Sequence, residues 1–175
     1  LNETGINLHH IQSIGPVFHW NTSAGGSAKF SPDGNKYVFH SIKNGLWFFN
    51  FDRETGMFSN MDYYPIFKAN WAIGLEWSAN GRYLYTSATD SLFQYDTWVE
   101  DIGSTETLVD VWDGTLDPFE THFGIMQRGP DCKIYMSSFS STRSIHVINN
   151  PDEPFPFCNF VQHDLKLVAS TGTIS

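Results

Sequence analysis

A turn rich in proline, aspartate, asparagine and glycine recurs three times between strand-like runs, at residues 29–37, 76–85 and 128–136. Proline presets φ at the first corner, aspartate or asparagine bonds back to its own backbone, and glycine supplies a positive φ. The flanking β-branched and aromatic residues favour a pleated, half-buried surface. Each copy therefore predicts a β-hairpin, whose blade-turn residues are Pro32, Asp33, Gly34, Asn80, Gly81, Pro130 and Asp131.

The spacing of these turns predicts the fold. Gly34, Gly81 and Cys132 occupy the same turn position and lie 47 and then 51 residues apart, a period that fits one β-propeller blade. Two more strand-like runs follow each hairpin, so each unit contains four strands. The sequence predicts an all-β protein, a β-propeller segment of three four-stranded antiparallel blades plus a leading strand.

The expected boundaries treat residues 1–175 as a single β-propeller segment. Its blade units cover about 27–66, 72–113 and 122–167, and residues 8–14 form the closing strand of a preceding blade. Known propellers have about four to eight blades, so three predict part of a larger ring. The chain begins at Leu1 and not at methionine, which indicates a mature or internal segment.

Charge and hydropathy limit the partners. Nineteen acidic residues outweigh ten basic ones, for a net charge of −9, and nucleic-acid binding requires a basic patch. No apolar run approaches the roughly 18 residues that a membrane-spanning helix needs. We therefore expect neither a nucleic-acid partner nor a membrane span.

The two cysteines allow two interpretations. Cys132 occupies an exposed turn and Cys158 lies in the last strand of the same unit, so they are either two unrelated thiols or a disulfide that staples the third blade. An exposed turn is an unusual place for a free cysteine, which favours the disulfide. Such a bond would contribute roughly 3.5 kcal/mol and would indicate an extracytoplasmic location.

An ordered set of motifs carries a family resemblance. The chain resembles the WD40-like propeller region of large secreted or cell-surface proteins of Bacteroidota, which often contain PKD-like modules and are associated with gliding motility and type IX secretion. The resemblance implies export and display at the outer surface, and transfers no catalytic residues. The family's later strand containing Pro-Asn-Phe is absent from this chain. The matching runs are 28–34, 51–56, 78–85, 92–96, 129–135, 146–154 and 158–160.

The sequence contains no recognised catalytic motif. Gly-x-Ser-x-Gly, His-Glu-x-x-His, Cys-x-x-Cys and the nucleotide-binding glycine patterns are absent. The first strands of the three units offer Lys29, Glu76 and His122, a mixed set unlike a metal shell. We therefore expect a non-enzymatic interaction or display module that binds protein or glycan through propeller loops. The alternatives are a propeller-type metal-dependent hydrolase or lactonase, and a purely structural spacer.

Carboxylates gather in the loops after the third strand of each unit, and such oxygen-rich loops can hold calcium. Their spacing lacks the alternation of a calcium loop, so we expect solvated turn carboxylates and no cofactor, with calcium as the minor alternative. The carboxylates are Asp52, Glu54, Asp96, Glu100, Asp101, Asp152 and Glu153.

Four tryptophans near strand ends are candidate ligand contacts, because exposed aromatics stack on sugars or anchor protein partners. The competing interpretation is packing within or between blades. These residues are Trp20, Trp71, Trp98 and Trp112. Separately, Ser91 lies in an Asp-Ser-Leu triplet that resembles the acceptor pattern for O-glycosylation in Bacteroidota.

Overall fold

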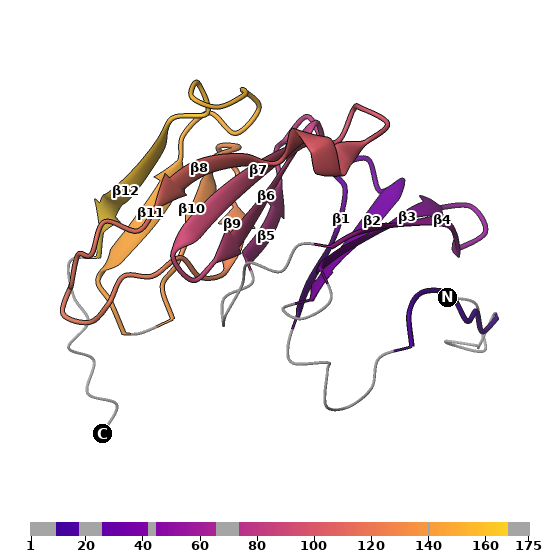
Figure 1. Ribbon diagram of the computed structural model, residues 1–175, viewed down its shortest axis with the longest axis horizontal. Helices are drawn as coiled ribbons and strands as arrows, with labels where there is room; N and C mark the ends of the chain where they lie inside the picture. The colour runs from indigo at the N-terminus through magenta and orange to yellow at the C-terminus, as the bar shows by residue number, and fades with distance from the viewer. Residues whose placement is uncertain (1–9, 18–25, 42–44, 66–73, 140, 168–175) are drawn as a thin grey trace, which may run out of the picture.

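The structure, a computed structural model, describes residues 10–17, 26–41, 45–65, 74–139 and 141–167. They form three four-stranded sheets, each an antiparallel meander that we call blade 1, 2 or 3. The sheets follow one another in chain order, from indigo to yellow in Figure 1. This confirms the predicted all-β fold. The strands are β1 Gly26–Phe30, β2 Lys36–Ser41, β3 Gly45–Asp52 and β4 Met57–Tyr64 in blade 1; β5 Gly74–Trp77, β6 Tyr83–Ala88, β7 Ser91–Asp96 and β8 Thr107–Val111 in blade 2; and β9 Met126–Arg128, β10 Ile134–Met136, β11 Ser144–Ile148 and β12 Phe160–Lys166 in blade 3.

The recurring turns close the first hairpin of each blade as their chemistry predicts. Gly34, Gly81 and Cys132 adopt φ values of 73°, 75° and 66°. Each donates its backbone N–H to the carbonyl three residues earlier, at 2.8, 3.1 and 3.1 Å respectively. The third copy thus uses a cysteine in a conformation that favours glycine.

Replacing Cys132 with glycine is expected to raise the free energy of unfolding by about 0.5–1 kcal/mol. A left-handed residue with a Cβ costs about 1–2 kcal/mol, part of which is offset by the greater freedom of glycine in the unfolded chain. Urea denaturation followed by circular dichroism measures the change. Gly81→Ala, at the equivalent turn with φ 75°, is the matched control and should destabilise. A less stable Cys132→Gly variant would show that the thiol has a role beyond the turn.

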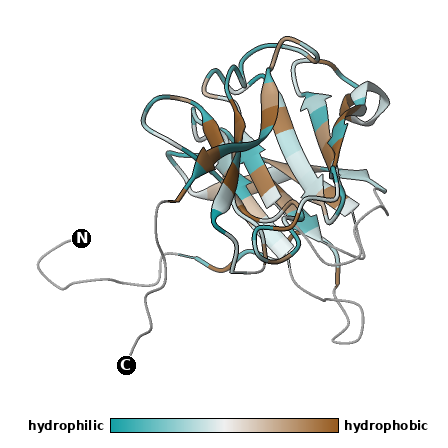
Figure 2. Cartoon of the chain, turned by 90° about the vertical axis from the view of Figure 1, so that its left-hand side faces the viewer, coloured by the Kyte–Doolittle hydropathy of each residue, from teal (hydrophilic) through white to brown (hydrophobic). Residues whose placement is uncertain are grey.

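Two apolar cores lie between successive blades and hold them together. Hydrophobic and hydrophilic residues are interspersed along the strands, as Figure 2 shows. Because successive side chains of a strand point to opposite faces, the hydrophobic residues reach both faces of a sheet. The core between blades 1 and 2 contains Val38, Leu46, Phe48, Leu75, Trp77, Leu84, Ala88, Phe93, Tyr95 and Ile102. The core between blades 2 and 3 contains Tyr83, Tyr85, Leu92, Val109, Phe123, Met126, Ile134, Met136, Ile148 and Cys158.

The first strand of each blade lies at the inner edge of the assembly. β5 contacts both β1 and β9, which belong to the neighbouring blades, and β4, β8 and β12 are at the opposite ends of their sheets. The inner strands therefore bring all three blades together at one place. Side chains there occupy the position of a propeller axis.

The beginning of the chain differs from the expected closing strand over 8–14. Its described part, residues 10–14, is not a strand, and residues 8 and 9 lie outside the described residues. This segment contacts β4 through the side-chain amide of Gln12 and not through a ladder of backbone hydrogen bonds. It donates to the carbonyl of Phe58 in β4 at 2.6 Å and accepts from the N–H of Phe58 at 2.8 Å.

The predicted disulfide is wrong, because both cysteines are free. Cys132 is exposed at its turn, whereas Cys158 is fully buried in the core between blades 2 and 3. Burial raises the pKa of the Cys158 thiol, so this side chain acts as a small apolar group. Apolar packing, and no covalent staple, joins the third blade to the second.

The described residues contain no helix long and apolar enough to cross a membrane.

Candidate binding rim

All the turns between first and second strands and the loops between third and fourth strands lie at the same end of the blades, since each sheet is an antiparallel meander. We call this end the turn rim; it comprises residues 31–35, 53–56, 78–82, 97–106, 129–133 and 149–159. Three hollows open on it, one beside each blade, with volumes of about 570, 450 and 370 Å³. The turn rim is therefore the natural place to look for a site.

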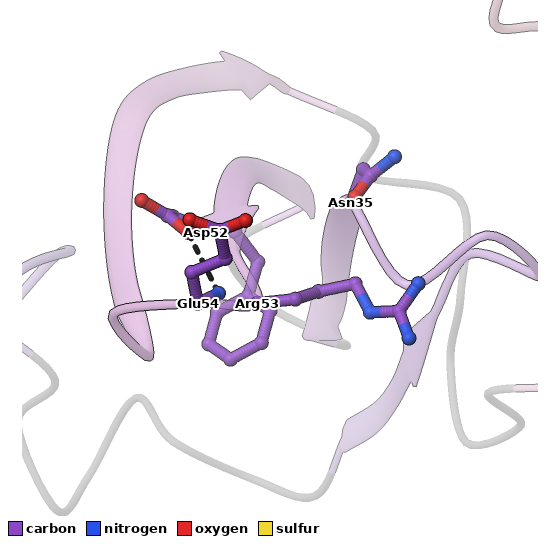
Figure 3. Close-up of a pocket in the computed structure, with 5 residues that line it drawn as sticks. Asn35, Asp52, Arg53 and Glu54 are labelled. Atoms are coloured by element: carbon purple, nitrogen blue, oxygen red, sulfur yellow. Dashed lines mark hydrogen bonds between the residues drawn. The ribbon is translucent and has the colours of Figure 1, made fainter.

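The hollow beside blade 1 is lined by side chains that stabilise its own loop. Asp52 accepts the N–H of Glu54 at 2.8 Å and that of Thr55 at 3.2 Å, and the bond from Glu54 leads in lowering the pKa of Asp52. Arg53 donates to the carbonyl of Asp33 at 3.0 Å. Figure 3 shows the guanidinium of Arg53 extending away from the carboxylates of Asp52 and Glu54. These groups fold a turn and do not converge on a ligand.

The hollow beside blade 2 is built around an ion pair. Arg82 donates from Nε and Nη2 to one oxygen of Asp96, at 3.0 and 2.8 Å. Burial acts to raise the pKa of Asp96, but the hydrogen bonds from Arg82 and from the N–H of Trp98 outweigh it and hold the pKa below its usual value. The wall includes Tyr83, Gln94, Ser104, Thr105, Glu106, Thr107, Pro154 and Phe155.

Trp98 stands beside this hollow with 65% of its surface exposed. The backbone N–H of Trp98 donates to Asp96 at 3.0 Å. The guanidinium carbon of Arg82 lies 5.4 Å from the centre of the Trp98 ring, within reach of a cation–π interaction. The loop that carries it continues into the 3₁₀ helix η1, Ile102–Thr105. Ile102 is buried in the core between blades 1 and 2, so the loop is anchored while the indole faces solvent.

The hollow beside blade 3 lies against a loop fastened to blade 2. Asp152 accepts the N–H of Asn80 at 2.9 Å. The buried amide of Gln94 donates to the carbonyl of Glu153 at 2.9 Å and accepts the N–H of Phe155, also at 2.9 Å. Sequence reasoning missed Gln94, although a glutamine within the apolar strand β7 was a visible signal.

The other candidate residues have different surroundings. Trp112 packs on His122, with ring centres 4.0 Å apart, and donates from Nε1 to Thr121 at 3.0 Å, so it secures the connection between blades 2 and 3. Ser91 begins β7 at the end of the blade opposite the turn rim, and its glycosylation stays a prediction. Trp20 and Trp71 lie outside the described residues.

The inner strands bring together three side chains at equivalent positions. Lys29 donates to Glu76 at 2.9 Å and to Gln127 at 3.0 Å. Glu76 also accepts the N–H of Arg128 at 3.1 Å and that of Trp77 at 3.0 Å. The Glu76 carboxylate thus accepts three hydrogen bonds, one each from β1, β5 and β9, and holds these strands together.

The third axial residue is Gln127, and the expectation of His122 is wrong. The first strand of blade 3 begins at Met126, because residues 112–125 form a connection whose only ladder contact in the described chain is the bridge between Leu116 and Glu120. His122 instead contacts Asp90 at 2.8 Å and Glu120 at 3.2 Å. Among the described residues, no three His, Cys, Asp or Glu side chains are arranged to hold a metal ion.

Comparisons with known proteins support the fold alone. No family model matches the chain, and no curated protein matches it. A crystal structure described as a candidate 6-phosphogluconolactonase from Bacteroides uniformis has a TM-score of 0.53 and 14% sequence identity, over 83% of this chain and 41% of that one. A second, from Bacteroides fragilis, has a TM-score of 0.51 and 16% identity, over 83% and 40%. The chain spans about two fifths of these proteins, and the similarity shows β-propeller blades.

Proposed function

We propose that this chain is a non-enzymatic binding module that docks a protein partner on the turn rim, at the hollow beside blade 2. The observation that carries the proposal is Trp98, 65% exposed next to Arg82. Tryptophan and arginine are the residues most enriched among those that dominate protein interfaces. An exposed indole beside a hollow of about 450 Å³ provides an anchor and a neighbouring recess for a partner side chain.

The three hollows differ in what they offer a ligand. Beside blades 1 and 3, Asp52 and Asp152 accept backbone N–H groups of the protein itself. The hollow beside blade 2 is lined by the Arg82–Asp96 pair and by Phe155, which is 44% exposed. The exposed Trp98 stands next to it, beside Arg82. This mixture of aromatic, charged and apolar surface suits a protein interface.

The loops around this hollow are held in place before any partner binds. Ile102 fixes the loop of Trp98 in the apolar core, and Gln94 fixes the loop of Phe155 through two hydrogen bonds. A preorganised site loses less conformational entropy on binding. Gln94 therefore contributes to binding indirectly, because its hydrogen bonds hold the loop of Phe155 in position.

A hydrolase of the lactonase type is the second candidate, because two solved structures with a similar fold carry that description. Their sequence identity to this chain is too low to transfer an activity. At the axis, Glu76 is neutralised by Lys29 and bonded by two backbone N–H groups, which favours a structural role for this carboxylate. The binding module is therefore the better-supported function.

The location belongs to the same proposal. The resemblance to secreted and surface propellers of Bacteroidota supports display at the bacterial cell surface, where the partner would be an extracellular or surface protein. Because both cysteines are free, the resemblance is the support for this placement.

Panning a phage-displayed random peptide library on the immobilised chain tests the proposal. Selected peptides should lose at least about 30-fold in affinity for Trp98→Ala, the effect of removing an interface residue worth about 2 kcal/mol. Phe139→Ala is the matched control, because Phe139 is 53% exposed between β10 and β11, away from the turn rim. Peptides that bind both variants equally, or a glycan array that gives the only Trp98-dependent signal, would contradict protein binding on this surface.

A further inference from the structure

The turn rim carries much of the negative charge of the chain. Its residues include eight acidic and three basic side chains, so its formal charge is −5, whereas that of the whole chain is −9. An acidic surface attracts cationic groups of a partner and repels anionic ones. The acidic residues are Asp33, Glu54, Glu100, Asp101, Glu106, Asp131, Asp152 and Glu153, and the basic ones are Arg53, Arg82 and Lys133.

The three basic side chains of the turn rim are already bonded within the protein. Arg53 donates to the backbone carbonyl of Asp33 at 3.0 Å. Lys133 donates to the side-chain oxygen of Asn149 at 2.6 Å. Arg82 forms the ion pair with the aspartate at the end of β7. The charge of the remaining carboxylates is therefore left for a partner to neutralise.

Two of these carboxylates border the hollow beside blade 2. Glu106 lines its wall and accepts the hydroxyl of Tyr95 at 2.9 Å, which holds the carboxylate in place. Glu153 is exposed and takes part in no ion pair among the described residues. Hydrogen bonds from Arg82 to Asp96 lead in raising the pKa of Arg82, and the charge of Glu153 adds to this effect. One guanidinium thus faces three carboxylates here, which leaves the hollow negatively charged.

Aromatic rings next to these carboxylates already contact a cation. The guanidinium carbon of Arg82 lies 5.4 Å from the centre of the Trp98 ring and 5.0 Å from that of Tyr83. Trp98 is 65% exposed and Phe155, on the wall of the hollow, is 44% exposed, so both rings have surface to offer a partner. Ring faces attract cations, and guanidinium groups stack on them well. The rings and the carboxylates are therefore complementary to the same kind of group, a planar cation.

We propose that the protein partner of the turn rim presents an arginine side chain to the hollow beside blade 2. Its guanidinium packs against the exposed aromatic surface of Trp98 and Phe155 and donates to the carboxylates of Glu106 and Glu153. The hollow, of about 450 Å³, has room for this long side chain. The inference rests on the proposed function and specifies which residue of the partner is recognised.

Arginine fits this hollow better than other side chains do. A guanidinium offers five N–H donors in a fixed plane and stacks on aromatic rings, whereas the lysine ammonium is a compact and strongly hydrated charge. An apolar partner residue would cover Glu106 and Glu153 without supplying a cation, and burying an unpaired charge is costly. The hollow therefore selects against neutral and acidic residues as well as favouring arginine.

The peptides obtained by panning on the immobilised chain provide the probe. Each peptide whose binding requires Trp98 should contain an arginine that is essential for affinity. Replacing it with citrulline, which has nearly the same shape and no charge, should weaken binding about tenfold, equivalent to about 1.4 kcal/mol. Fluorescence anisotropy of the labelled peptides measures both affinities, and the arginine peptide should lose more affinity than the citrulline peptide as salt is added.

Variants of the chain identify the carboxylates that receive the arginine. The double variant Glu106→Gln with Glu153→Gln should bind the arginine peptide about tenfold more weakly and bind the citrulline peptide as the wild type does. Glu54→Gln is the matched control, because Glu54 is an exposed carboxylate of the turn rim beside blade 1, and it should change neither affinity. Circular dichroism spectra that match the wild type show that the variants are folded.

The outcomes separate this inference from the proposed function. Peptides that require Trp98 but lack arginine, or that bind equally well with citrulline, overturn the inference and leave protein binding on the turn rim intact. An equal loss of affinity for Glu54→Gln and for the double variant also overturns it, because the attraction would then come from the general charge of the rim. If no selected peptide depends on Trp98, the proposed function fails and the inference fails with it.

Discussion

Replacing Trp77 with alanine is expected to lower the free energy of unfolding by about 3–5 kcal/mol, the usual cost of removing a large buried aromatic side chain. Trp77 is 1% exposed and belongs to the core between blades 1 and 2. Its ring meets that of Phe48 edge to face, with centres 6.4 Å apart. The variant would leave a cavity in the surface that joins the two blades.

The equivalent residue in blade 1 provides the comparison. Phe30 pairs with Tyr37 as Trp77 pairs with Leu84. Phe30→Ala should cost only about 1 kcal/mol, because about half of the surface of Phe30 is already in water. Trp77→Phe should be mild as well, since the indole Nε1 of Trp77 is buried without a hydrogen-bond partner among the described residues. Urea denaturation followed by circular dichroism measures the stability of all three variants. Equal costs for Trp77→Ala and Phe30→Ala would contradict the difference in burial between these two equivalent positions.

The blade pattern was predictable because local turn chemistry determines it. Aspartate or asparagine followed by a residue that accepts positive φ recurs after 47 and then 51 residues, and this pair sets the first hairpin of each blade through local interactions. The glycines at positions 34 and 81 made the pattern visible. Even Cys132, which breaks the composition, keeps the conformation, with φ 66°.

The beginning of blade 3 was not predictable from the same signals. The strand-like run near His122 resembles a first strand in composition, but tertiary contacts keep it in the connection between blades. His122 there contacts Asp90 and Glu120, and β9 is only three residues long. A short strand leaves little periodicity to detect, so the axial position was assigned to His122 and not to Gln127.

The candidate site was predictable in part. A tryptophan in a polar loop after a strand suggests exposure, and Trp98 has it, whereas Trp112 follows a similar pattern and is packed on His122. Whether such a tryptophan is exposed or packed depends on contacts with residues distant in the sequence, which local patterns do not reveal. Arg82, adjacent in sequence to a turn glycine, gave no local sign that it would pair with Asp96 and stack beside Trp98.

Replacing Glu76 with alanine is expected to lower the free energy of unfolding by about 3 kcal/mol, near the lower end of the range for breaking a buried ion pair. Glu76 is 5% exposed and accepts hydrogen bonds from Lys29, Arg128 and Trp77. The variant would leave two backbone N–H groups without their acceptor and the Lys29 ammonium with Gln127 as its remaining partner. Because the three donors belong to β1, β5 and β9, the loss should affect the contact among all three blades.

A double-mutant cycle separates the ion pair from the rest of the effect. Lys29→Met should also destabilise, since it leaves the Glu76 carboxylate buried without its cation, while Lys29→Met with Glu76→Leu should be more stable than the sum of the single variants predicts. Gln127→Ala is the matched control: it removes the exposed partner of Lys29 and should cost less than about 1 kcal/mol. If Glu76→Ala changes stability no more than Gln127→Ala does, the axial carboxylate is free of a structural role, and its chemistry would then become the first place to look for catalysis.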